Sequence, residues 1–375
     1  MSEYQYYEFV AVDGPISDEG MRYAQGCSSR AQVSRHRWQN TYHFGDFHGS
    51  AETLLKHYDA HFYIANWGSV RLGLAFPEGC LSPVALRPYL RKGKQYEITL
   101  TAQQVENRWI VWWERNEEGG WGWTEGEGII DQLLGIREEL MCGDYRALFL
   151  GWLADFDPEE WQDPKESSAV IPPIPMGLDN LSPPLSALIG HFPVDCDALS
   201  VACVLSQSAR RDRIPIASVI EELPESEMRQ LLQRVAQGDG ARVMSELNRL
   251  TYPVAEAPAT PGMTCTEFAA RILDVRKARL EREAQAAEAK RQCEQEARRQ
   301  HLAAVMKRAD TIWAGLDSLM DQKIASAYDQ AAAQLNELHD AHEQAGGNSR
   351  FQERLRAFRE RYARRPAMMR RIAEL

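Results

Sequence analysis

The sequence lacks the cysteine pairs that would place it among metal-caged or disulfide-built proteins. Its seven cysteines are scattered and odd in number, and no two are spaced as C-x-x-C, the pattern of thiolate zinc sites and dithiol redox centres. It also has no apolar run long enough to cross a bilayer and no basic opening segment of a secretory signal. We therefore expect a cytoplasmic protein that contacts no membrane.

Motifs that identify a reaction are missing as well. There is no G-x-S-x-G nucleophile elbow. The glycine-rich segment at residues 118–128 carries three glutamates and no lysine, so it does not have the composition or spacing of a phosphate-binding loop. From these absences we expect no cofactor. Whether the protein is an enzyme stays open, with a non-enzymatic role favoured.

The net charge of −11 is unevenly distributed. Residues 267–375 contain 21 Lys and Arg against 17 Asp and Glu, whereas residues 1–266 have a net charge of −15. An acidic front part repels nucleic-acid phosphates and anionic membranes. Residues 350–375 form a basic tail with nine arginines and three glutamates. We expect this tail to be either a solvated helix face or a site for an acidic partner or nucleic acid, through Arg354, Arg361, Arg364, Arg365, Arg370 and Arg371.

Aromatic and β-branched residues are concentrated in the first part of the chain. Nine of the ten tryptophans lie between Trp38 and Trp161. Runs of strand type occur at residues 4–12, 32–44, 69–76, 95–101 and 109–114, and helical spacing occurs at residues 50–64 and 129–152. This mixture predicts an α+β domain over residues 1–154, with a mixed or antiparallel sheet and helices packed on it.

The rest of the chain is expected to be helical. Seven prolines make residues 155–184 a linker, and short apolar-periodic runs predict a small helical domain at residues 185–252. A long charged helix is predicted at residues 263–321 and a terminal helical hairpin at residues 322–375. Residues 281–300 offer no large apolar residue except Cys293, so we expect a solvated spacer, with a zipper-like contact of its alanine face as the alternative.

Two segments resemble known protein families. The first is carried by Trp313, the run Ala-Tyr-Asp-Gln-Ala at residues 327–331, Leu335, Phe351, Leu355, the segment at residues 361–366 and Leu375. It resembles the carboxy-terminal helical segment of bacterial SWIM-type zinc-finger proteins. The opening Tyr-Gln-Tyr-Tyr-Glu-Phe and the run at residues 42–46 resemble an uncharacterised bacterial family. The resemblance implies a bacterial setting and a reusable helical module; the SWIM zinc motif itself is absent here, so neither zinc nor DNA association is implied.

Histidines gather in one window of the sequence. Five of the nine lie at positions 36–61. On the predicted helix, His57 and His61 are four residues apart and share one side, so they could hold a metal together with His43 or Asp46. The hydrolytic version of this motif has Glu after the first histidine, where this chain has Tyr58. The alternative is that these histidines are structural or lie on the surface, with His61 packed beside Phe62 and bonded to a carbonyl.

Tryptophans form a second candidate site. Trp109 and Trp113 are expected on one face of a strand and Trp112 on the other, followed by Trp121 and Trp123 in the glycine-rich segment. Exposed rings would stack on bases or sugars or anchor a protein. The alternative is that they fill the core beneath a helix.

Three functions are compatible with this sequence. The favoured one is a non-enzymatic interaction or scaffold protein of a bacterial cytoplasmic system, because globular parts joined by a long helix suit the holding of protein partners. The first alternative is an enzyme or metal-binding protein with its site between His36 and His61. The second is a nucleic-acid accessory factor that uses the basic tail.

Overall fold

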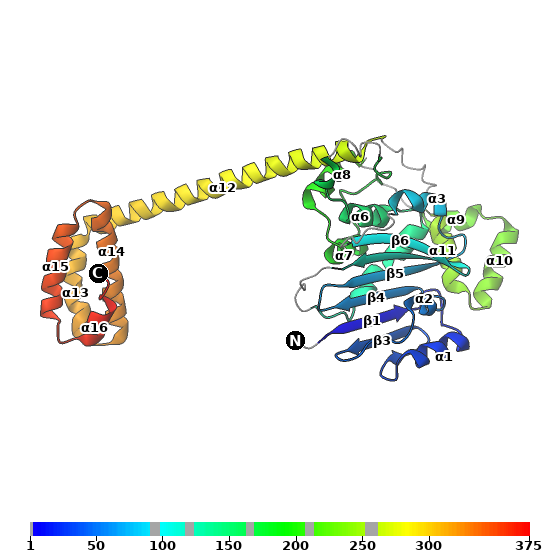
Figure 1. Ribbon diagram of the computed structural model, residues 1–375, viewed down its shortest axis with the longest axis horizontal. Helices are drawn as coiled ribbons and strands as arrows, with labels where there is room; N and C mark the ends of the chain where they lie inside the picture. The colour runs from blue at the N-terminus through cyan, green and yellow to red at the C-terminus, as the bar shows by residue number, and fades with distance from the viewer. Residues whose placement is uncertain (1–2, 91–97, 117–123, 163–168, 207–213, 252–261) are drawn as a thin grey trace. The chain divides into compact units, whose positions relative to one another are not determined.

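The computed structural model describes residues 3–90, 98–116, 124–162, 169–206, 214–251 and 262–375 (Figure 1). The chain divides into two compact units, Met1–Arg276 and Lys277–Leu375. The first unit combines a sheet with helices, and the second is helical. The predicted fold class, an α+β region followed by helical segments and a long helix, is confirmed, and the sheet is of the antiparallel kind.

Within the described residues, seven strands form one antiparallel sheet in the order β2-β3-β1-β4-β5-β7-β6. The strands are β1 (Gln5–Val10), β2 (Gln32–Val33), β3 (Arg37–Tyr42), β4 (Ala60–Ala65), β5 (Val70–Pro77), β6 (Ile98–Val105) and β7 (Arg108–Arg115). The predicted hairpin at residues 95–114 is present as β6 and β7, and its turn contains Glu106, whose φ is 54°. Aromatic and β-branched residues dominate the central strands because they pack well on a pleated surface.

The two faces of the sheet carry separate cores because successive side chains of a strand point to opposite sides. Tyr6 and Val10 of β1 belong to one core, which also holds Trp113. Phe9 belongs to the other, together with Trp38 and Trp112. Helices α1 (Asp18–Cys27) and α2 (Ala51–Leu54) cover part of this second face, so the sheet is packed on both sides.

A larger helical layer covers the first face. Its members are α3 (Pro83–Leu86), η1 (Arg87–Tyr89), α4 (Ile129–Leu133), α5 (Gly135–Met141), α6 (Arg146–Ala154), η2 (Glu160–Gln162), α7 (Pro183–His191), α8 (Cys196–Leu205) and the first turns of α12 (Cys265–Lys307). The single helix predicted at residues 129–152 is therefore three shorter ones. Gly143, with a φ of 77°, lies where α5 gives way to α6, because a glycine reaches this left-handed conformation without a steric penalty.

The segment predicted as a linker and separate helical domain packs partly on the sheet instead. Ile171, Ile174 and Leu178, which lie among or just after the prolines, are buried in the same core as Leu185 and Leu188 of α7. Proline disfavours helix and sheet at residues 172–175, whereas Pro183 and Pro184 form the first turn of α7, where proline is tolerated. The apolar residues between the prolines still bury against neighbours. The structure thus differs from the predicted boundary near residue 185, and α7 and α8 belong to the first unit.

A helical trio completes the first unit. It consists of α9 (Ile216–Glu222), α10 (Glu225–Ala236) and α11 (Gly240–Leu250). The α11 helix contacts α9, α10 and α5, and Asn248 Nδ2 donates to Glu138 Oε1 of α5 at 3.0 Å. Val219, Val243 and Leu247 supply the buried apolar side chains of the trio.

The second unit contains the later turns of α12 with α13 (Ala309–Gln322), α14 (Ala325–Gln344), α15 (Asn348–Arg361) and α16 (Pro366–Arg371). Leu316, Leu335, Phe351 and Leu355 are fully buried at its centre. The predicted terminal hairpin is present as α14 and α15, joined at Gly346 and Gly347. The helix predicted over residues 263–321 is two helices, since α12 ends at Lys307 and α13 begins at Ala309.

Two helical glycines in the first unit provide a matched test of its packing. A Cβ at Gly151 of α6 would lie 2.6 Å from Trp113 Nε1, whereas a Cβ at Gly26 of α1 meets nothing within 4 Å. We expect Gly151→Ala to lower the free energy of unfolding by about 1–3 kcal/mol because it overpacks the core. Gly26→Ala is expected to leave it unchanged or raise it by up to about 1 kcal/mol. Urea unfolding of both variants checks this, and equal shifts would contradict it.

Candidate functional site

Several loops meet at one end of the sheet, the end at which β3, β4 and β7 finish. Register places Tyr42, Gln5 and Ala65 side by side there, with Val70 opposite Arg115 on the neighbouring pair. The segment after β3 and the turn between β4 and β5 leave the sheet at this end. Loops held by a rigid sheet are common locations for binding groups, so this end is the first candidate.

A tyrosine cluster occupies the second face of the sheet at this end. Tyr7 and Tyr63 are direct cross-strand neighbours, with ring centroids 4.5 Å apart. Tyr63 Oη donates to Gln5 Oε1 at 3.3 Å, and Tyr7 Oη lies 3.1 Å from both Gln5 Oε1 and Asp46 Oδ1. Burial, then the charge of Asp46, raises the pKa of Tyr63 to about 12, and burial also raises the pKa of Tyr7. Both phenols therefore stay neutral hydrogen-bond donors at physiological pH.

The structure does not assemble the predicted metal site. Residues 50–64 are not one helix: α2 ends at Leu54, and residues 60–65 form strand β4. The β-type run Ala-His-Phe-Tyr-Ile-Ala pairs with β1 on one side and β5 on the other, and this pairing outweighs the helical spacing of its apolar residues. Consequently His57 and His61 do not share a helix face.

The four predicted ligands are in four different settings. His43 is exposed, with its ring centroid 6.1 Å from that of Tyr4. Asp46 accepts from Tyr7 and from the backbone N–H of Phe47. His57 packs against α1, where a Cβ at Gly20 would touch its ring, and burial lowers its pKa.

His61 has a structural role. It is 1% exposed, its ring stacks on Phe9 at 4.1 Å, and Nδ1 lies 3.0 Å from the carbonyl oxygen of Glu8. Burial, and then the nearby charge of Arg71, lowers its pKa to about 3. The structural alternative predicted the contact with a carbonyl, but it named the wrong ring: His61 stacks on Phe9, whereas Phe62 points to the opposite face of the sheet.

The predicted aromatic surface is only partly within the described residues. Trp109 and Trp113 share one face of β7 and Trp112 takes the other, as expected from strand alternation. Trp113 is fully buried and its Nε1 donates to the carbonyl oxygen of Ala147 at 3.3 Å. It therefore belongs to the core and to no exposed surface, and Trp109 packs against that core. Trp121 and Trp123 lie outside the described residues.

A small cavity lies on the first face at the same end of the sheet. Its volume is about 170 Å³. The residues around it include Ile64, Ala65, Arg115, Thr124, Gly190 and His191. Residues from β4, β7 and the end of α7 thus enclose one space. Sequence reasoning missed this group because its members are up to 127 positions apart, from Ile64 to His191, and only strand order brings them together.

Most arginines of the basic tail contact other residues of the second unit. Arg354 pairs with Asp310 at 2.5 Å, and Arg361 with Asp317 at 2.7 Å. Arg371 pairs with Asp329 at 2.6 Å and Arg365 Nη1 donates to Tyr328 Oη at 2.8 Å, whereas Arg364 and Arg370 are exposed. These arginines link α15 and α16 to α13 and α14, which reduces the positive surface open to a phosphate backbone.

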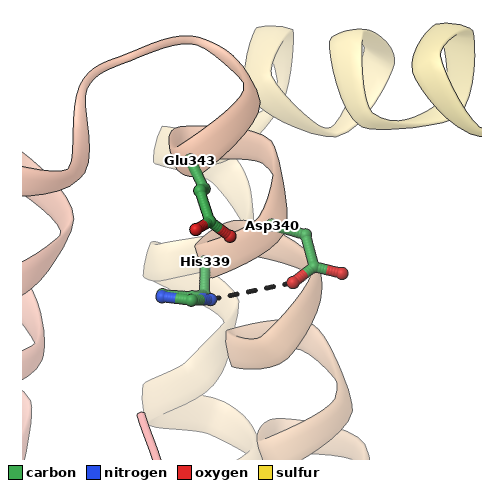
Figure 2. Close-up of side chains that lie close together, drawn as sticks. All are labelled: His339, Asp340 and Glu343. Atoms are coloured by element: carbon green, nitrogen blue, oxygen red, sulfur yellow. Dashed lines mark ion pairs between the residues drawn. The ribbon is translucent and has the colours of Figure 1, made fainter.

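One group of metal-capable side chains is found among the described residues, and it lies elsewhere. His339, Asp340 and Glu343 of α14 have ligand atoms within 4.8 Å of one another (Figure 2). His339 Nδ1 is 3.7 Å from Asp340 Oδ1. However, Asp340 also pairs with Arg298 at 2.5 Å, so a cation would have to compete with a guanidinium for this carboxylate. Helical i, i+4 spacing of His339 and Glu343 is the signal that could have identified the group.

Comparison with known proteins gives no further indication of function. No family model, no curated protein and no solved structure matches the chain. The resemblance to SWIM-type proteins therefore stays a prediction. Across the described part of the chain, every helix is too short or too polar to traverse a bilayer.

Proposed function

We propose that this protein is a non-enzymatic interaction protein of a bacterial cytoplasmic system, in which α10 binds an amphipathic helix of a protein partner. The observation that carries the proposal is an apolar stripe on α10 of which one side is exposed: Leu232 and Val235 are exposed, and Met228 and Leu231 are half-buried. Met228, Leu231, Leu232 and Val235 recur at i, i+3, i+4 and i+7, the spacing of one helix face. No residue of α10 is buried.

The exposure of two of these four side chains is large for apolar residues. Leu232 is 69% exposed and Val235 is 47% exposed. Contiguous exposed apolar residues on the surface of a folded protein commonly mark an interaction site. A partner helix that places its own apolar face on the stripe would remove these side chains from water, which is the helix-in-groove mode of recognition.

The charges around the stripe indicate what kind of helix fits. The end of α9 and the start of α10 carry four exposed glutamates, at positions 221, 222, 225 and 227. Arg229 pairs with one of them, Glu225, at 2.8 Å. The acidic excess favours a partner helix with basic residues beside its apolar face, since complementary charge speeds association and excludes acidic competitors.

The long helix α12 supports a scaffold role. Every residue at positions 281–300 is exposed, so this segment buries no side chain, and Arg298, which pairs with Asp340 of α14, lies near its end. Its stability comes from helix-favouring residues and from local pairs such as Lys290 with Glu294 at 4.0 Å and Gln292 Nε2 with Glu288 Oε1 at 3.0 Å. A helix that stands in water without a core of its own is suited to act as a spacer.

The proposal predicts that added charge on the stripe abolishes partner binding. The variant Leu232→Glu/Val235→Glu places two carboxylates where the partner's apolar face would pack. We expect it to recover at least about tenfold less partner than the wild type in affinity purification, because each buried charge without a pair costs several kcal/mol. Glutamate favours helix, so circular dichroism is expected to be unchanged.

The matched control adds the same charge to the same helix. Gln230 and Gln233 are exposed and lie between the stripe positions, so Gln230→Glu/Gln233→Glu is expected to retain the partner. Cross-linking followed by mass spectrometry should place a basic amphipathic helix of the partner on α10. Equal recovery with both double variants, or an acidic contact segment, would refute the proposal.

A further inference from the structure

Three side chains near the carboxyl end of α14 converge on one point. His339 and Glu343 are four residues apart, and Asp340 directly follows His339. Residues four apart are neighbours on one helix face, and Figure 2 shows the carboxylate of Glu343 on the same side as the imidazole of His339 and the carboxylate of Asp340. One ligand atom of each side chain lies within 4.8 Å of the other two. One imidazole and two carboxylates are therefore gathered in a small space.

The spacing of these atoms is close to that of ligands around a single ion. Zinc bonds to nitrogen and oxygen of about 2.0–2.2 Å, at a tetrahedral angle, place two ligand atoms about 3.4 Å apart. His339 Nδ1 and Asp340 Oδ1 are 3.7 Å apart. The side chain of Glu343 is exposed, so a change of rotamer can bring its carboxylate to the same ion. Small side-chain movements are thus sufficient to form a set of three ligands.

The imidazole of His339 is oriented by the core of the second unit. Its ring packs edge-on against Phe351, with centroids 5.3 Å apart, and Phe351 is fully buried. The side chain of His339 is nevertheless 25% exposed, so an ion can reach it from solvent. A ligand that packing already orients loses less conformational entropy on binding. His342 differs in this respect, because it is 3% exposed and its Nδ1 lies 3.2 Å from the carbonyl oxygen of Gly347.

Arg298 of α12 is the cation nearest to this group of ligands. Its Nη2 lies 2.5 Å from Asp340 Oδ2, whereas the oxygen that faces the imidazole is Oδ1. A carboxylate can accept from different groups through its two oxygens. The next arginine, Arg299, pairs with Glu296 at 2.9 Å. Arg298 therefore competes for the charge of the carboxylate and not for the oxygen that faces the site, and Glu343 supplies a second negative charge.

We propose that His339, Asp340 and Glu343 form a binding site for a divalent transition-metal ion such as Zn²⁺, with water completing the coordination. Imidazole suits zinc, copper and nickel, whereas calcium and magnesium prefer oxygen ligands. An ion there would also lie near the carboxyl end of α14, where the helix dipole favours positive charge. The site belongs to the second unit and does not depend on the proposed partner of α10.

Isothermal titration of the untagged full chain with Zn²⁺ tests the proposal. We expect saturable binding with a dissociation constant below about 100 μM. Mg²⁺, over the same range of concentration, should not bind because it takes oxygen ligands and gives up its water reluctantly. Absence of saturable Zn²⁺ binding, or Mg²⁺ binding of equal strength, would overturn the proposal.

Two variants of the site and one matched control locate the ion. His339→Gln and Glu343→Gln are each expected to weaken Zn²⁺ binding at least about tenfold, an effect that the loss of groups merely supporting a ligand can produce. Because His339 also packs on Phe351, Glu343→Gln is the variant that leaves the packing unchanged. His301→Gln removes an exposed imidazole of the same unit, 3.0 Å from Glu337, and should leave the affinity unchanged. Equal loss in the control and in the site variants would contradict the assignment.

A substitution of Arg298 is expected to have the opposite sign. Arg298→Gln removes the guanidinium and leaves the charge of Asp340 to the ion, so Zn²⁺ binding should tighten by about fivefold, the effect of one unit charge a few ångströms away in water. An ion held by histidines elsewhere in the chain would not respond to this change. Unchanged or weaker Zn²⁺ binding in Arg298→Gln would therefore count against the site.

Discussion

Replacing Arg137 with methionine is expected to lower the free energy of unfolding of the first unit by about 3–5 kcal/mol. Arg137 is 2% exposed and donates to both carboxylate oxygens of Asp13, at 2.8 and 2.5 Å, and to the carbonyl oxygen of Ala75 at 2.8 Å. It also lies 3.6 Å from Asp59, which pairs with Arg108. The substitution would remove one of the positive charges that stabilise the ionised form of these buried carboxylates.

The effect of these arginines is visible in the ionisation of Asp59. Burial by itself would raise the pKa of this carboxyl, but Arg137 and Arg108, with backbone N–H groups, hold it below the usual range. Asp59 accepts from the N–H groups of Val12 and Asp13 at 2.6 and 2.9 Å. The network therefore joins the end of β1 to β4, to the start of β7 and to α5, and its loss should loosen all of them.

Denaturant unfolding followed by tryptophan fluorescence measures this effect, because nine of the ten tryptophans lie between Trp38 and Trp161 in the first unit. The control is Arg35→Met, which removes an arginine whose ion pair with Asp18 is 51% and 85% exposed. Exposed pairs contribute little, so no measurable change is expected there. If both substitutions changed the midpoint equally, the buried network would not have the role assigned to it.

Acidification from pH 7 to pH 5 is expected to remove about 2 kcal/mol of stability through His61 alone. Its pKa is about 3 in the folded protein, against ~6.5 in an unfolded chain. Between these values the unfolded chain binds a proton that the folded protein does not, so stability falls as the pH is lowered through this window. Above pH 6.5 the imidazole is neutral in both states and the contribution is complete.

The comparison that isolates this effect is His61→Gln, measured at pH 7 and pH 5 by the same unfolding method. Glutamine can donate to the carbonyl oxygen of Glu8 but does not titrate. His57 and His191 also have lowered pKa values. They therefore contribute part of the pH dependence of stability in both the wild type and the variant. The variant is therefore expected to lose less stability on acidification than the wild type. Equal losses would show that His61 is not responsible.

Residues 50–64 show why part of the candidate site could not be predicted. Leu54, Tyr58, His61 and Phe62 follow helical spacing, and Ser50 does cap a helix, accepting from the N–H of Thr53 at 3.1 Å. That helix ends at Leu54 because residues 60–65 gain two strand partners, β1 and β5. Partners this distant in sequence cannot be read from local spacing, and the metal hypothesis depended on the helix.

The basic tail shows the same limit for electrostatics. Counting arginines predicts a positive surface, whereas Asp310, Asp317 and Asp329 each lie more than 40 residues from the arginine that they pair with. Less positive charge is consequently available to bind a nucleic acid than the composition indicates. By contrast, the alternation of Trp109, Trp112 and Trp113 was predictable, because it depends only on the two-residue period of a strand.

The sequence by itself determined the aromatic α+β region, the solvated long helix and the terminal hairpin. The first and third follow from local periodicity, and the second from a shortage of large apolar residues; that the sheet is antiparallel throughout its described strands was decided by strand pairing. Tertiary structure alone decided that the proline-rich segment packs on the sheet, that His61 is buried and neutral, and that Arg115 and His191 line one cavity. These features arise from contacts between residues far apart in the chain. Which of these contacts form depends on burial and strand pairing over the whole unit. A local sequence pattern does not contain this information.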